Sequence, residues 1–177
     1  MRKIPKKNYI IVGIISILTI IIVGYFTFWY KETKEYNDNH SIMSGYLLEM
    51  GEDEVIVNLS NYVLDNPDAV LYVSYGNDIE VKEFENEFKK FIHQNDIKQL
   101  FIYIDLNRIK DKKFINDFKN TFFDEELKNK NVVIEKQPNI FIFKDGKVES
   151  ALYYTKQKIN MMDVKSYLEN KEVIEND

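Results

Sequence analysis

A run of 22 residues without a charged side chain, from Tyr9 to Tyr30, constrains this 177-residue chain more than any other feature. As a helix rising about 1.5 Å per residue, the run would be about 33 Å long, which matches a hydrocarbon core of about 30 Å. Basic residues precede it, and aromatic residues gather at its far end: Arg2, Lys3, Lys6 and Lys7, then Tyr25, Phe26, Phe28, Trp29 and Tyr30. The pattern predicts a cytoplasmic tail over 1–8, a single transmembrane helix over 9–30 in the cell membrane, and an extracytoplasmic remainder.

A cleaved signal peptide is the alternative reading of this run. The apolar region of a signal peptide has about 7–15 residues and ends in small residues. The run here is longer and ends in the bulky sequence YFTFWY. We therefore expect a retained signal anchor that contacts membrane lipid from Tyr9 to Tyr30.

Composition limits the chemistry and the partners of the remaining chain. Four of the 24 Lys and Arg residues precede residue 31, so 31–177 carry 20 of them against 29 Asp and Glu, a net charge of −9. This acidic balance argues against a nucleic-acid partner. The absence of cysteine excludes disulfides, thiol catalysis and thiolate metal sites. His40 and His93 have no third ligand spaced near either of them, so we expect no metal and no cofactor.

The stretch 69–88 (AVLYVSYGNDIEVKEFENEF) organises the rest of the chain. Its apolar start predicts a strand buried on both faces, followed by a turn and a helix whose apolar side chains recur at helical spacing. Asn77 or Asp78 would cap this helix, and Asn77 with Glu80 resembles a capping box. Glu85 is predicted on a solvated face, where it can pair with Lys89.

The other expected elements follow from periodicity and turn signals. A polar spacer is expected over 31–40, and 41–50 fits a helix or a strand equally well, so 31–54 is treated as spacer and uncertain segment before a domain over 55–177. Expected strands are 55–59, 69–74, 99–104, 132–134 and a hairpin of 140–143 with 148–154. Expected helices are 60–64, 79–94, one within 111–123, a short one after Asp124, and 161–170.

Four segments, in order, resemble the thioredoxin-like superfamily: VLYVSYGNDIEVKEF, YIDLN, QPNIFIFKDGKV and DVKSYLEN, together covering about 55–170. The resemblance implies an α/β fold, a mixed sheet flanked by helices, here preceded by one transmembrane helix. The chain also resembles, less specifically, membrane-anchored thioredoxin-like accessory proteins of bacteriocin production in Gram-positive bacteria. Its abundant Lys, Ile and Asn fit an AT-rich genome of that kind.

The resemblance also locates a site. Aligning Lys82 with the residue after the family's Cys-x-x-Cys motif puts Asp78 and Val81 at the cysteine positions. It also puts Tyr72 where many thioredoxins keep a buried acid for proton transfer. This chain therefore cannot carry out the family's disulfide exchange, and we expect no enzymatic activity and no catalytic residue.

The family's proline loop is the second part of that site. The resemblance implies a cis peptide between Gln137 and Pro138, beside which a substrate segment would pair as an added strand. Two simpler readings stay open: Asp78 is only a helix cap, and the proline loop only shapes the fold.

The expected function is therefore that of a redox-inactive accessory factor in export or envelope processes, which binds a protein or peptide outside the cytoplasm. Two alternatives remain: a structural subunit of a membrane complex that acts through its anchor, and an enzyme of non-redox chemistry near Asp78. The candidate binding residues are Tyr75, Gly76, Asn77, Asp78, Ile79, Glu80, Val81, Gln137, Pro138 and Asn139.

Overall fold

The structure is a computed structural model that describes residues 6–51, 53–134, 138–155 and 158–175. It divides into two compact units, Met1–Asn39 and His40–Asp177. The first unit contains one helix, α1 (Lys6–Asn39), of which Asn8–Tyr36 is long and apolar enough to cross a membrane. The polar segment that we expected as a spacer is helical as far as Asn39, because it contains neither glycine nor proline and several good helix formers.

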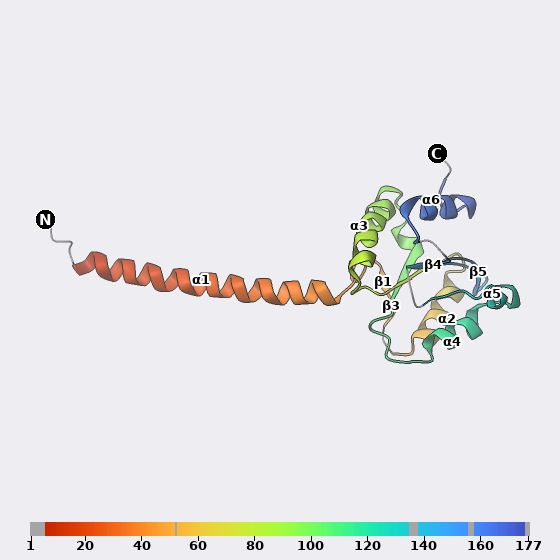
Figure 1. The fold of residues 1–177 in the computed structure, drawn as a ribbon, viewed down its shortest axis with the longest axis horizontal. Coiled ribbons are helices and arrows are strands. Elements are labelled where there is room, and N and C mark those ends of the chain that lie inside the picture. Colours follow the sequence, from red (N-terminus) through yellow and green to blue (C-terminus); the bar gives the residue numbers. More distant parts are fainter. Residues whose placement is uncertain (1–5, 52, 135–137, 156–157, 176–177) are drawn as a thin grey trace. The chain divides into compact units, whose positions relative to one another are not determined.

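A five-stranded mixed sheet forms the centre of the second unit (Figure 1). Its strands lie in the order β1-β3-β2-β4-β5, with β1, β3 and β2 parallel and β4 antiparallel to both β2 and β5. The strand bounds are β1 Leu48–Glu49, β2 Val70–Ser74, β3 Phe101–Asp105, β4 Asn139–Lys144 and β5 Lys147–Leu152. Both faces of the central strands are buried, as the apolar start of 69–88 predicted.

Helices cover both faces of this sheet. They are α2 Val55–Asp65, α3 Ile79–Gln94, α4 Phe114–Phe122, α5 Glu125–Asn129 and α6 Met161–Asn170, with a 3₁₀ turn, η1, at Lys98–Leu100. Figure 1 shows α3 and α6 on one side and α2 and α4 on the other. The side chains of β2 alternate between the two faces of the sheet. Tyr72 packs in the core under α3 and α6, whereas Leu71 and Val73 pack in the core of α2 and α4. The result is a three-layer α/β domain.

Two predicted strands are wrong. Residues 55–59 begin helix α2, in which Val55, Leu59 and Val63 are buried at a spacing of four residues while Val57 is 54% exposed. The β-branched run VIVNL favours a strand locally, but burial of one helical stripe against the sheet outweighs that preference. Residues 132–134 are not a strand either, because they pack into the core without pairing with the sheet.

The strongest periodic segments were predicted well. Helices α3 and α6 have the predicted bounds, β2 differs by one residue, and the hairpin of β4 and β5 turns at Asp145-Gly146 as expected. The segment 41–50, left open between helix and strand, is neither throughout. It makes a turn in which Met43 and Leu47 are buried under α3, and then forms the two-residue strand β1.

Candidate functional site

The turn between β2 and α3 is the site that sequence analysis singled out. Helix α3 is capped by Asp78, whose Oδ1 accepts hydrogen bonds from the backbone N–H groups of Glu80 at 2.8 Å and Val81 at 3.3 Å. Asp78 is therefore the cap, and the capping box expected from Asn77 and Glu80 does not form. The turn is thus fixed at its helical end by its own side chain.

Gly76 is held from two sides. Its N–H donates to Asp105 Oδ1 at 3.3 Å, and Asp105 is itself buried at the end of β3. On the other side lies Ser41: a Cβ on Gly76 would come within 2.2 Å of the Ser41 Cβ and 2.6 Å of its Cα. Only glycine fits between these neighbours, because the closest atoms belong to backbone or sit next to it. A side chain at position 76 would therefore require the backbone of Ser41 to shift.

A buried carboxylate, Glu85, lies beneath this turn. Its Oε1 accepts hydrogen bonds from Ser74 Oγ at 2.8 Å and Tyr72 Oη at 3.2 Å. Its Oε2 accepts from Ser41 Oγ at 2.8 Å and from the Ile42 N–H at 2.9 Å. The side chain has no exposed surface. One carboxylate thus joins helix α3, strand β2 and the segment before β1.

The expectation that Glu85 lies on a solvated helix face is wrong. Glu85 follows Val81 by four residues and precedes Phe88 by three, so it lies on the buried stripe of α3 that ends with Ile92. Lys89, its expected partner, lies instead over the ring of Tyr46, with Nζ 4.6 Å from the ring centroid. The spacing signal was present in the sequence, but the charge of Glu85 masked it.

Burial dominates the electrostatics of this cluster. It raises the pKa of Glu85, although the hydrogen bonds from Ser74, Ser41, Ile42 and Tyr72 oppose the shift by stabilising the carboxylate. Burial, and then the charge of Glu85, raise the pKa of Tyr72 and likewise that of Tyr103, whose Oη lies 3.1 Å from Ser74 Oγ. A buried acid therefore lies next to Tyr72, contributed by the neighbouring helix.

The predicted binding residues divide by exposure. Asn77, Asp78, Ile79 and Glu80 are exposed, Ile79 to 75%, and Tyr75 is half-buried against the core of α2 and α4. Four others are buried and can only shape this surface: Gly76, Val81, Pro138 and Asn139.

Strand pairing relates the proline loop to the turn. Asn139 pairs with Val73 in antiparallel strands, so the chain just before Asn139 runs beside the end of β2 from which the turn leaves. Gln137, and with it the peptide bond to Pro138, lies outside the described residues.

A loop distant in sequence completes the exposed part of the site. Lys158, between β5 and α6, donates to Glu80 Oε2 at 2.5 Å, and the hydrogen bond and charge of Glu80 raise the pKa of Lys158. We call the five exposed side chains Asn77, Asp78, Ile79, Glu80 and Lys158 the turn surface. It offers one apolar side chain with charged groups beside it.

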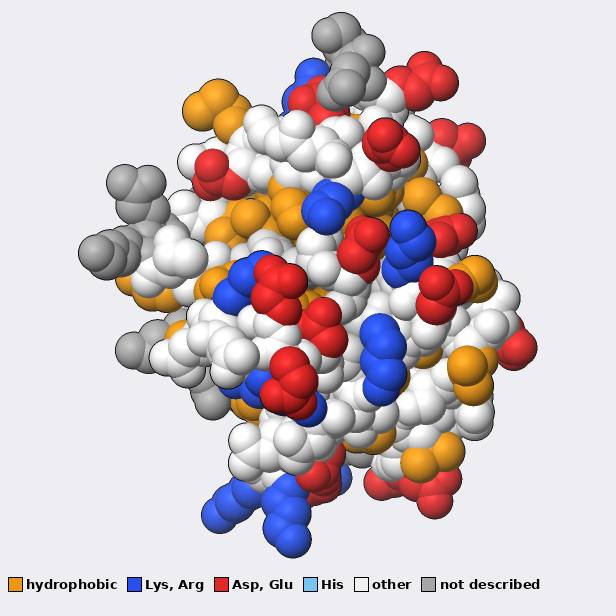
Figure 2. Space-filling model, turned by 90° about the vertical axis from the view of Figure 1, so that its right-hand side faces the viewer, with side chains coloured by type: hydrophobic (Ala, Val, Ile, Leu, Met, Phe, Trp, Pro, Cys, Tyr) orange, Lys and Arg blue, Asp and Glu red, His pale blue; other side chains and the backbone are white. Residues whose placement is uncertain are grey.

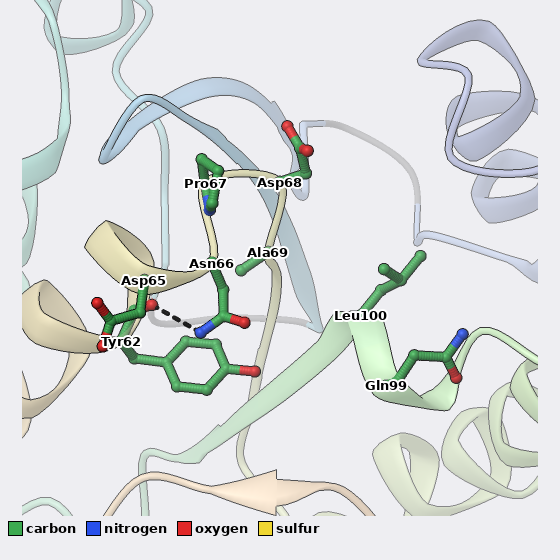
Figure 3. Close-up of a pocket in the computed structure, with 8 residues that line it drawn as sticks. All are labelled: Tyr62, Asp65, Asn66, Pro67, Asp68, Ala69, Gln99 and Leu100. Atoms are coloured by element: carbon green, nitrogen blue, oxygen red, sulfur yellow. Dashed lines mark hydrogen bonds between the residues drawn. The ribbon is translucent and has the colours of Figure 1, made fainter.

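The surface cavities elsewhere in the domain contain fewer groups that could act as catalytic or binding residues. A cavity of about 250 Å³ lies at the amino ends of β2 and β3, the opposite end of the sheet from the turn surface (Figure 3). In it the amide of Asn66 donates to the Tyr62 carbonyl, and its carboxylates are Asp65 and Asp68. Among the residues lining this cavity there is no nucleophile paired with a base. In the part of the chain that the structure describes, no three His, Asp or Glu side chains gather as metal ligands.

The surface charge is mixed. On the face presented in Figure 2, acidic and basic side chains are interspersed and hydrophobic side chains appear in small groups between them. A second hollow, of about 470 Å³, lies between β5 and α6 and is lined by Leu152, Tyr153, Ile159 and Tyr167 among others. Neither this hollow nor the face in Figure 2 concentrates charge of one sign.

No protein-family model matches the chain, and no curated protein sequence does. A mixed sheet flanked by helices, with an antiparallel hairpin at one edge, is the arrangement that the four sequence segments implied. The fold is thioredoxin-like.

Solved structures similar to the chain are thioredoxins. The structure of thioredoxin O1 from Arabidopsis thaliana in the oxidised state is 12% identical, with a TM-score of 0.45, and the match covers 70% of this chain and 96% of that one. Thioredoxin f2 from Chlamydomonas reinhardtii is 15% identical, with a TM-score of 0.43, over 71% of this chain and 95% of that one.

Proposed function

We propose that this thioredoxin-like protein is a redox-inactive accessory factor, anchored in the cell membrane, that binds a protein or peptide through the turn surface outside the cytoplasm. The observation that carries the proposal is the turn itself. Where the resemblance places the family's cysteine pair, this chain has no thiol and an exposed turn that is tied down at Gly76 by Asp105 and at its helical end by the Asp78 cap. A rigid turn loses little conformational entropy when a partner binds, which favours recognition.

The side chains at the turn support binding better than catalysis. The carboxylate of Asp78 is engaged as a helix cap, and that of Glu85 is enclosed and hydrogen-bonded to four donors. Neither is free to act on a substrate. Ile79, by contrast, exposes three quarters of its surface beside the ion pair of Glu80 and Lys158. An apolar side chain with polar neighbours is typical of protein interfaces.

The anchor and the resemblance support the cellular part of the proposal. The basic residues before the apolar run favour a cytoplasmic N-terminus, and helix α1 is long enough to cross the membrane. Export of a bacteriocin in a Gram-positive bacterium is the setting in which the resembling accessory proteins work. We propose bacteriocin export as the specific process in which this protein takes part.

The test is crosslinking in the native membrane. A photoreactive residue in place of the exposed Asn77 should capture one specific partner, to be identified by mass spectrometry. In that background Ile79→Ser should reduce capture by about tenfold, since it removes the apolar contact. Leu64→Ser is the matched control, because Leu64 is similarly exposed, at 71%, but lies on α2 on the other face of the sheet.

Two outcomes would contradict the proposal. Undiminished capture by Ile79→Ser would place the contact elsewhere. An unrelated apolar helix in place of residues 9–30 should leave capture of the partner unchanged. If the replacement abolished capture, the result would instead favour a structural subunit that acts through its anchor.

A further inference from the structure

The segment 41–47, which we call the juxtamembrane segment, follows directly after the end of α1 in the sequence. Met43 and Leu47 are buried in the same core as Phe88 and Ile92 of α3. Tyr46 lies farther along α3, under Lys89. The segment therefore covers α3 for about one turn of the helix.

Glu85 connects the start of this segment to the rest of the domain by hydrogen bonds, and farther along Ser44 Oγ donates to Glu49 Oε2 at 2.6 Å. Glu85 Oε2 binds Ser41 Oγ and the Ile42 N–H, while Oε1 binds Ser74 and Tyr72 of β2. Ser41 Oγ in turn accepts the Met43 N–H at 2.9 Å. Glu85 thus accepts hydrogen bonds from both Ser41 and Ile42, and Ser41 also interacts with the hydroxyl of Tyr103.

We propose that Glu85 is a proton-linked latch: its protonated carboxyl holds the juxtamembrane segment on the turn before α3, and its ionisation loosens that segment while the rest of the domain stays folded. The latch goes beyond the binding function proposed above and operates whether or not a partner is present.

The protonated state fits the geometry. A proton on Oε1 can be donated to Ser74 Oγ or Tyr72 Oη, because hydroxyl groups accept hydrogen bonds as readily as they donate them. Ser74 can then direct its own proton to Tyr103 Oη, 3.1 Å away. Oε2 keeps accepting from Ser41 and Ile42, so no contact is lost.

The ionised state leaves a charge without water. Among the described residues, the hydrogen-bond partners of Glu85 are three hydroxyl groups and one backbone amide, none of them positively charged, and burial opposes ionisation. Residues 41 and 42 are neither helix nor strand, so lifting them is the least disruptive way to hydrate the carboxylate. An open segment returns Glu85 to the pKa of an exposed carboxyl. A rise in pH through the raised pKa therefore favours opening, and a fall favours closure.

Other titratable groups lie near the latch: Glu49 accepts a hydrogen bond from Ser44 of the segment, and Lys98 lies over the ring of Tyr46. Tyr72 on β2 and Tyr103 on β3 have raised pKa values and keep their protons, and Asp105 lies farther along β3, where its charge adds to the shift of Tyr103. On α3 and the segment, Lys89 faces Tyr46. His40 directly precedes Ser41 in the sequence, so the test includes a His40 variant.

Hydrogen exchange of the full chain in lipid nanodiscs tests the latch between pH 5 and 8, after correction for intrinsic exchange rates. Protection of the Ile42, Met43 and Leu47 amides should fall by about threefold or more as pH rises, while protection in α6 stays constant. Glu85→Gln should remove the pH dependence. Glu83→Gln, an exposed change on the same helix, and His40→Gln should retain it.

Three results would overturn the latch: protection independent of pH in the wild type, the same dependence in Glu85→Gln, or parallel loss in α6. Should Glu85→Gln not fold, the carboxyl carbon of Glu85 in the wild-type protein gives a second readout by nuclear magnetic resonance. Its titration midpoint should coincide with that of the protection change, and separate midpoints would refute the proposal.

Discussion

Ser41 occupies the space that any side chain on Gly76 would need, with its Cβ 2.2 Å from where a Gly76 Cβ would lie. The contact joins the first residues of the domain to the turn before α3, 35 positions later in the sequence. Since Glu85 binds the same serine from the other side, the turn surface and the juxtamembrane segment share one packing arrangement.

Gly76→Ala should therefore destabilise the domain by about 1–3 kcal/mol, because the backbone of Ser41 must move. Gly51→Ala is the matched control: a Cβ there meets nothing within 4 Å, and the change should stay within about 0.5 kcal/mol. Urea unfolding followed by near-ultraviolet circular dichroism of the buried tyrosines measures both. Equal effects of the two substitutions would contradict the close contact.

Glu85→Ala should lower the free energy of unfolding by about 2–4 kcal/mol at pH 7. The change leaves the hydroxyl groups of Ser41 and Ser74 and the Ile42 N–H without the acceptor they have in the wild type. Glu85→Gln should cost less than about 1.5 kcal/mol, because the amide oxygen can accept from Ser41 and Ile42 while its NH₂ donates to the hydroxyls of β2.

The pH dependence of unfolding has a defined sign. The folded-state pKa of Glu85 is raised, so its contribution to stability is complete at low pH and is lost as pH rises through that pKa. The free energy of unfolding of the wild type, relative to Glu85→Gln, should fall as pH rises. A relative stability that increases with pH would show that the carboxylate is stabilised in the fold.

The helical assignment of 55–65 separates two neighbouring residues. Leu59→Ala should cost about 2–4 kcal/mol because Leu59 is fully buried, whereas Val57→Ala should be nearly neutral because Val57 is 54% exposed. A strand would bury residues 55, 57 and 59 alike. Thermal or urea denaturation of the two variants decides, and comparable losses would restore the strand.

The orientation of the anchor can be measured directly. Protease added to intact cells after removal of the wall should digest the domain over 40–177 and spare the N-terminal tail, because the basic residues favour the cytoplasmic side. A tag at each end, followed by immunoblotting, reports the two sides. Full protection of the C-terminal tag in intact cells, together with its digestion after lysis, would reverse the orientation.

The sequence predicted most reliably those elements whose pattern was long. Helix α3 repeats its buried stripe from Val81 to Ile92, and a fully apolar stretch precedes it, so strand, turn and helix were all readable. Strand β1 could not be predicted, because two residues are too short for any periodicity. In α2 the β-branched residues locally favour a β-strand, and the burial of Leu59 against the sheet, which outweighs that preference, cannot be read from the sequence.

The turn before α3 and its cap could be predicted from the sequence, but the buried contacts beneath the turn could not. The cap at Asp78 followed from the boundary between turn and helix, and the structure confirms it. Glu85 was missed because a charged residue is usually exposed, and the hydroxyl groups that allow its burial come from residues 41, 72 and 74. No pattern within one helix can reveal donors that are supplied by other segments.

The two edges of the sheet also affect how copies of the domain behave at high local concentration. β1 exposes an edge of only two residues, where Glu49 is bonded to Ser44 and paired with Arg108. At the other edge, Glu149 of β5 pairs with Lys144 and Lys171. A two-residue strand at one edge, and charged pairs on the six-residue strand at the other, resist strand pairing between molecules, so the domain should stay free of β-aggregation even at high local density.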